Sequence, residues 1–251
     1  MCFDLDSTPP VPRISGAAVS HRDLTLEARD GNRLAAFAAW PDEPTRVGVV
    51  VCPDVRGLYR FYEELALRFA EHGHAAVAID YFGRTAGVGK RGDGFDYMPH
   101  VERTTHEGIQ ADVAAAVAHL REHGREAIFT VGFCFGGRCA WLAAAAGHGL
   151  AGAIGFYGRP RDGRPPDSPS PIEAAGSMRA PILALMGGAD PSIPAEDVRA
   201  FEEALAAAGV EHEVVVYPGA PHSFFDRKQE QFAAESDDAW KRVLAFIQRH
   251  A

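Results

Sequence analysis

Short apolar runs recur along the chain, each bounded by glycine, proline or charged residues. Continuous apolar runs of this length are typical of strands buried on both faces of a parallel sheet. They lie at residues 47–52, 75–80, 127–131, 151–156, 181–186 and 213–217. Residues 23–27 instead alternate polar and apolar side chains, and residues 33–40 run back after a turn at Gly31. This pattern predicts an antiparallel hairpin with one solvated face.

Between the strands, apolar residues recur at intervals of three and four, which is the spacing of one face of an α-helix. One such face is formed by Ile109, Val113, Val117 and Leu120. Glycine stops this segment at Gly124. Further helices are expected around residues 65–73, 137–144, 194–209 and 240–247.

Strands that alternate with helices require a mostly parallel sheet covered by helices on both faces, so the fold class is α/β. The leading hairpin adds an antiparallel edge to this sheet. Residues 83–106 and 160–170 show no periodicity, and we expect two loops near the carboxyl ends of the strands. A proline-rich segment opens the chain. We therefore predict an irregular surface arm over residues 1–20 and a single domain over residues 21–251.

The composition excludes several classes of function. A chain of 251 residues suits one large α/β domain. Its formal net charge of −9 argues against binding to nucleic acid or to an anionic membrane. No apolar run approaches the ~20 residues of a membrane span. The N-terminal residues lack the basic and apolar regions of a signal peptide, so we expect a cytoplasmic protein.

The four cysteines are Cys2, Cys52, Cys134 and Cys139. They show neither C-x-x-C spacing nor metal-type spacing with histidine, and we expect no metal ion and no cofactor. In a reducing compartment they remain free thiols. Cys52 and Cys139 are expected in the core.

Cys134 stands apart because it lies in the sequence Gly-Phe-Cys-Phe-Gly at residues 132–136, between a predicted strand and a predicted helix. This is the form of a nucleophile elbow, in which a tight strand-to-helix turn exposes the reactive side chain. The next backbone N–H then points to where an oxyanion forms. The alternative is a buried cysteine in a glycine-rich turn.

A thiol nucleophile needs a base and an acid that orients the base. His222 follows the last predicted strand and so arrives at the carboxyl edge of the sheet, where open α/β sheets place their chemistry. His100 and His106, in the long loop, remain alternatives. Asp190 follows the strand at 181–186, with a helix-capping role ahead of the next helix as its alternative. The chain order cysteine, aspartate, histidine is that of α/β-hydrolases.

These motifs together resemble the dienelactone hydrolase family of the α/β-hydrolase fold, from about residue 20 to the C-terminus. The matching segments lie at residues 132–137, 156–158, 187–190 and 221–224. The resemblance implies hydrolysis of an ester or an enol lactone. It also implies that Cys134 is the nucleophile, His222 the base and Asp190 its orienting acid. The backbone N–H groups of Val55 and Phe135 would form the oxyanion hole.

The resemblance also suggests residues that contact the substrate. Arg84 matches an arginine that binds the substrate carboxylate in the family, and Tyr157 is a candidate for the pocket wall. Asp54 occupies the position of a glutamate that keeps the resting thiol neutral. The family arginine expected four residues after the histidine is replaced by an aspartate, with Arg227 one position further. Arg56 and Arg60 are alternative sources of that charge.

The predicted reaction is attack of the thiolate on an ester carbonyl, formation of a thioester and its hydrolysis. The expected partner is a small ester or lactone, with a carboxylate-bearing substrate as one option, and the protein is expected as a monomer or weak homodimer. A broader carboxylesterase or thioesterase on the same site is an alternative. Another is a redox or ligand sensor that uses Cys134 as a switch.

Overall fold

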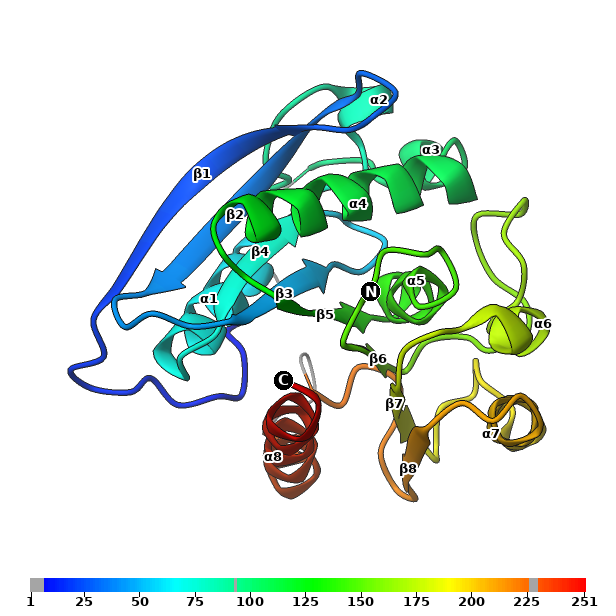
Figure 1. Cartoon of the computed structure of the whole chain (residues 1–251). Coiled ribbons are helices and arrows are strands. Elements are labelled where there is room, and N and C mark those ends of the chain that lie inside the picture. Colours follow the sequence, from blue (N-terminus) through cyan, green and yellow to red (C-terminus); the bar gives the residue numbers. More distant parts are fainter. Residues whose placement is uncertain (1–6, 93, 226–229) are drawn as a thin grey trace.

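The structure, a computed structural model, describes residues 7–92, 94–225 and 230–251. Its strands form one eight-stranded sheet in the order β1-β2-β4-β3-β5-β6-β7-β8 (Figure 1). All neighbours from β4 to β8 run parallel, whereas β1 pairs with β2, and β2 with β4, in antiparallel register. The strands are β1 (Val19–Glu27), β2 (Arg33–Pro41), β3 (Val47–Cys52), β4 (Ala75–Ile79), β5 (Ala127–Phe133), β6 (Gly152–Phe156), β7 (Ile182–Gly187) and β8 (His212–Tyr217).

Helices cover the two faces of this sheet (Figure 1). They are α1 (Arg60–Glu71), α2 (Gly83–Ala86), α3 (Met98–Val101), α4 (His106–Glu122), α5 (Phe135–Ala143), α6 (Pro171–Ala174), the 3₁₀ turn η1 (Ala175–Ser177), α7 (Ala195–Ala207) and α8 (Ala233–His250). Among the helices described, none is both long enough and apolar enough to cross a bilayer.

Alternation along β3 divides the core into two clusters. Val49 lies in one cluster with Leu65 of α1 and Val243 of α8. Val50 lies in the other, with Val113 of α4. Because successive side chains of a strand point to opposite faces, a strand that is apolar throughout packs against helices on both sides. This confirms the predicted α/β class, with a mostly parallel sheet and a leading antiparallel hairpin.

The exposure of the hairpin to solvent differs from the prediction. We expected one solvated face, but β2 is buried along most of its length, whereas β1 is largely exposed. The reason is position in the sheet. β2 is an inner strand between β1 and β4, and its side chains enter both core clusters: Phe37 lies in the cluster with α1, and Ala36 lies in the cluster with α4.

The two segments predicted as loops differ from each other. Residues 83–106 contain the one-turn helices α2 and α3, and they lead directly into α4. Such short helices leave no periodic signal, because four residues do not complete a second turn. Residues 160–170 contain no helix or strand.

The N-terminal arm lies along α1. Its described residues, 7–18, form no helix or strand before β1 begins. Val11 is nevertheless buried in the cluster that contains α1. Arg13 pairs with Glu64 at 3.0 Å, and the backbone N–H of Ile14 donates to Glu71. The arm expected on the surface is therefore anchored by one buried side chain and by polar contacts.

Candidate active site

The predicted turn around Cys134 is present between β5 and α5. Cys134 has φ 56° and ψ −113°, a conformation that is strained for any residue other than glycine. Its backbone N–H donates to the carbonyl oxygen of Phe156 at 3.0 Å. The elbow is thus tied to the end of β6, and the thiol is held at the carboxyl edge of the sheet.

Two glycines allow the elbow to close. A Cβ atom on Gly132 would collide with the carbonyl oxygen of Gly136. A Cβ atom on Gly136 would collide with the carbonyl oxygens of Cys52 and Pro53, at the end of β3. Because hydrogen alone fits at both positions, α5 can begin directly against the loop that follows β3.

The predicted base and acid are joined by a short hydrogen bond. His222 Nδ1 lies 2.5 Å from Asp190 Oδ2. The other carboxylate oxygen accepts from the backbone N–H of Ser192 at 2.8 Å and from its hydroxyl at 2.6 Å. Burial favours the neutral acid, but the hydrogen bonds from His222 and Ser192 outweigh it and lower the pKa of Asp190. An ionised Asp190 fixes the Nδ1 proton, so Nε2 is the nitrogen that can exchange a proton with a thiol.

Tyr157 connects this pair to the elbow. Its ring centroid lies 4.9 Å from that of His222. It directly follows Phe156, whose carbonyl oxygen accepts from Cys134. The histidine loop and the nucleophile loop therefore meet at the end of β6.

A cavity of about 200 Å³ opens beside Cys134. Its apolar wall includes Val55 and Phe135, the two residues whose N–H groups were predicted to form the oxyanion hole. The rest of its lining is Arg138, Arg159, Gly163 and Arg164. The thiol and both expected donor residues thus line one cavity.

Asp54 lies behind this cavity in a buried pair. Its carboxylate accepts from the backbone N–H of Arg56 at 2.8 Å and from the Arg56 guanidinium at 3.1 Å. Its own N–H donates to the hydroxyl of Tyr62. The guanidinium of Arg56 lies over the ring of Tyr59. Asp54 and Arg56 are therefore partners of each other, which fixes the loop that carries Val55.

Arg84, expected on the substrate carboxylate, does not line the cavity. Its guanidinium binds Asp30 in the hairpin turn at 2.8 Å and Asp112 of α4 at 2.7 Å. The sequence could not show this contact, because Asp30 and Asp112 lie far from Arg84 along the chain. Arg227 lies outside the described residues.

The alternative bases are engaged in other contacts, and neither ring is paired with a described carboxylate side chain as that of His222 is. His100 shares a hydrogen bond with the hydroxyl of Thr85 at 2.9 Å. The Nδ1 atom of His106 lies 3.4 Å from the hydroxyl of Ser168, and its backbone N–H donates to Asp167. In the described part of the chain, no three histidine, cysteine, aspartate or glutamate side chains gather as metal ligands.

Arg138 is a residue of this region to which the sequence analysis gave no role. It lies in α5, one turn after Cys134, and is 3% exposed. Its guanidinium donates to the carbonyl oxygens of Arg159 and Arg161 at 3.0 Å and of Pro169 at 2.8 Å. The sequence contains one signal for such a role: Arg138 is the only charged residue in the otherwise apolar helix α5 that follows the elbow.

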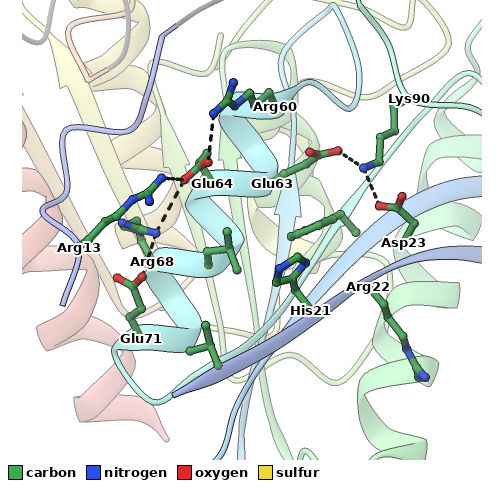
Figure 2. A pocket seen from close by; sticks show the side chains of 13 residues that line it. Arg13, His21, Arg22, Asp23, Arg60, Glu63, Glu64, Arg68, Glu71 and Lys90 are labelled. Carbon is green, nitrogen blue, oxygen red and sulfur yellow. Dashed lines mark hydrogen bonds and ion pairs between the residues drawn. The ribbon is translucent and has the colours of Figure 1, made fainter. Parts of the chain in front are cut away.

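A larger hollow, of about 780 Å³, lies between α1, the hairpin and the arm (Figure 2). Figure 2 shows Glu64 between Arg13, Arg60 and Arg68, and Lys90 between Asp23 and Glu63. Among the residues that the structure describes, its lining holds no cysteine, serine or threonine nucleophile. The smaller cavity is therefore the candidate active site.

The parallel sheet, the strained elbow and the acid–histidine pair beyond β7 and β8 define an α/β-hydrolase. The sequence profile described as "Dienelactone hydrolase family" matches residues 34–251, and the chain belongs to this family. It is thus a hydrolase of the dienelactone hydrolase family.

Relatives agree with this assignment. A protein of Yersinia pestis named "Putative carboxymethylenebutenolidase" is 31% identical over 243 residues, which cover 92% of this chain and 89% of that protein. The crystal structure of a "Putative Dienelactone Hydrolase" from Klebsiella pneumoniae is 29% identical, with a TM-score of 0.80 over 92% of this chain and 99% of its own. An acylaminoacyl peptidase of Pyrococcus horikoshii, 17% identical, has a TM-score of 0.72 over 92% of this chain and 42% of its own, and it shares the fold alone.

Proposed function

We propose that this hydrolase cleaves an ester or enol-lactone bond through a Cys134–His222–Asp190 triad and a thioester intermediate. The observation that carries the proposal is the 2.5 Å contact between His222 Nδ1 and Asp190 Oδ2. It lies at the sheet edge where the strained elbow holds Cys134. A histidine with its Nδ1 proton fixed in this way is oriented to act as a base through Nε2.

In the first half of the reaction, Nε2 of His222 takes the thiol proton and Sγ of Cys134 attacks the carbonyl carbon. The carbonyl oxygen becomes an oxyanion, which accepts hydrogen bonds from the N–H groups of Val55 and Phe135. The intermediate then collapses. The bond to the leaving oxygen breaks, that oxygen takes the proton from His222, and the acyl group remains on Cys134 as a thioester.

In the second half, His222 takes a proton from water, and the hydroxide attacks the thioester carbonyl. Sγ leaves and recovers the proton, which releases the acid and regenerates the thiol. Asp190 stays ionised throughout and stabilises the imidazolium.

The other described cysteines make Cys134 the natural nucleophile. Burial raises the pKa of Cys52 to about 12 and also raises that of Cys139. Both side chains therefore remain protonated at neutral pH. Cys134 is partly exposed to the cavity.

The test compares hydrolysis of 4-nitrophenyl esters by the wild type, Cys134→Ala and His222→Ala. We expect the wild type to release a burst of 4-nitrophenol equal in amount to its active sites. Both variants should lose ~10³-fold or more in kcat/KM. Cys139→Ala, which removes a buried thiol five positions away, is the matched control and should keep its activity. Full activity in Cys134→Ala would overturn the proposal. A thiol that oxidises readily in a protein without esterase activity would favour the sensor.

A further inference from the structure

The cavity beside Cys134 has an unusual share of positive charge. Arg138, Arg159 and Arg164 all line it, in a chain whose net charge is −9. We infer that Arg159 and Arg164 bind an anionic group on the acyl part of the substrate, and so set the substrate preference of the site. This inference rests on the proposed function.

Among the described residues, no carboxylate forms an ion pair with Arg138. Its hydrogen bonds go to three backbone carbonyl oxygens, which are neutral acceptors. Its Nε atom is buried without a hydrogen-bond partner among the described residues. A Cβ atom on Gly163 would lie 2.9–3.2 Å from the Cδ, Nε and Cζ atoms of Arg138, so the loop backbone rests directly on this side chain. The side chain on which the loop packs is therefore cationic.

Arg159 and Arg164 are the two accessible arginines of the cavity. Within the described residues, no carboxylate lies within ion-pair distance of Arg159. Arg164 lies 3.6 Å from Glu102, but both side chains are about half exposed. An exposed pair at this distance contributes little and is readily exchanged for a ligand. Guanidinium groups bind carboxylates in a bidentate manner, which makes a carboxylate the fitting ligand.

The loop that carries these arginines is held in place at several points. Arg138 binds it from below through the carbonyl oxygens of residues 159, 161 and 169. Asp167 accepts from the N–H of His106 at the start of α4. Ser170 and Glu173 form a reciprocal capping box where the loop enters α6. A loop fixed in this way presents its charges without a large ordering cost on binding.

Arg84 does not contribute to the positive charge of this cavity. Its two carboxylate partners occupy its guanidinium, so the cation expected from the family resemblance is engaged elsewhere. An anionic acyl group that reaches the cavity would instead meet the arginines on the loop after β6. The recognition of charge would then come from a segment that the family motifs do not include.

The test uses two esters with the same leaving group, mono-4-nitrophenyl adipate and 4-nitrophenyl hexanoate, which differ by a carboxylate in place of a methyl group. We expect the wild type to prefer the adipate. Arg159→Gln and Arg164→Gln should each lower kcat/KM for the adipate by about 10-fold, mainly through KM, and leave the hexanoate within about twofold. Free adipate should inhibit the wild type competitively. It should no longer inhibit the double variant Arg159→Gln/Arg164→Gln.

Arg161→Gln is the matched control. It removes the same charge from the same loop, but the Arg161 guanidinium binds Asp197 at 2.6 Å and does not line the cavity. It should leave the adipate preference unchanged. A wild type without preference for the adipate would overturn the inference. An adipate preference in the Arg159→Gln/Arg164→Gln double variant equal to that of the wild type would overturn the inference as well. In both cases, turnover of the hexanoate would leave the proposed function standing. Failure to hydrolyse either ester would instead overturn the proposed function.

Discussion

The two hollows of this protein differ in what their charges do. In the large hollow of Figure 2, most acidic and basic side chains are paired with one another: Glu64 and Glu71 with Arg13 and Arg68, and Asp23 and Glu63 with Lys90. In the small cavity beside Cys134, three arginines gather, and no acidic side chain belongs to the described part of its wall. Charges that satisfy one another leave little for a ligand, whereas unneutralised charges favour an anionic one. Size alone would have selected the other hollow.

Their places in the fold explain the difference. The large hollow lies at the antiparallel edge, where α1 and the arm meet β1, and its ion pairs hold these elements together. The small cavity lies beyond the carboxyl ends of the parallel strands β3 and β5, where the loops after several strands converge. In α/β sheets that edge is where ligands bind. One hollow therefore maintains structure, and the other is available for chemistry.

The largest expected difference between the two regions is in activity. Asp190→Asn removes the charge that holds the Nδ1 proton of His222 and stabilises its cationic form. We expect kcat/KM for 4-nitrophenyl acetate to fall about 10³-fold or more. Circular dichroism should show a folded variant, because an asparagine side chain fits the same space. A loss below about tenfold would show that Asp190 does not orient the base.

The matched change in the large hollow is Glu64→Gln. Glu64 accepts from Arg13 at 3.0 Å and lies 3.7 Å from the buried Arg68, so its loss leaves Arg68 with Glu71 alone. We expect the free energy of unfolding to fall by about 1 kcal/mol, with kcat/KM unchanged within about twofold. Urea denaturation and esterase assays measure the two effects.

Glu126→Gln provides the control for this change. It breaks a fully solvated pair with Arg46, and it should alter the free energy of unfolding by less than about 0.5 kcal/mol. A tenfold loss of activity in Glu64→Gln would show that the large hollow takes part in function after all.

The sequence predicted the parts of this comparison that depend on local pattern. The apolar run 47–52 coincides with β3, and the glycines around Cys134 predicted the turn that the structure contains. Periodicity and tight-turn chemistry are properties of neighbouring residues, and one sequence is enough to read them.

The parts that depend on contacts between distant residues could not be predicted. Arg138 finds its acceptors 21 to 31 positions downstream, and Arg84 finds Asp30 54 positions upstream. Which arginine meets a carboxylate and which meets a cavity depends on how loops pack, and no local pattern encodes this. The buried Val11 escaped prediction for the same reason, since a proline-rich arm gives no signal of what it covers.

The pH dependence of stability distinguishes the two ends of the sheet. His74 precedes β4, at the edge opposite the site, and burial lowers its pKa from 6.5 to about 4. Between these values the unfolded chain binds a proton that the folded protein excludes. Its contribution to stability is therefore complete above pH 6.5 and is lost as the pH falls towards 4. We expect His74 to lower the free energy of unfolding by about 2 kcal/mol between about pH 7 and 5, measured by urea denaturation.

His74→Gln should reduce this dependence without abolishing it, because burial also lowers the pKa of His148 to about 4. At the other end of the sheet, the lowered pKa of Asp190 acts in a more acidic range, below the ordinary value of 3.8. Mild acid should therefore act on His74 and His148 while the Asp190 carboxylate stays ionised. If the free energy of unfolding changed with pH equally in His74→Gln and the wild type, the sensitivity to acid would come from other residues. The contrast between the two ends of the sheet would then be removed.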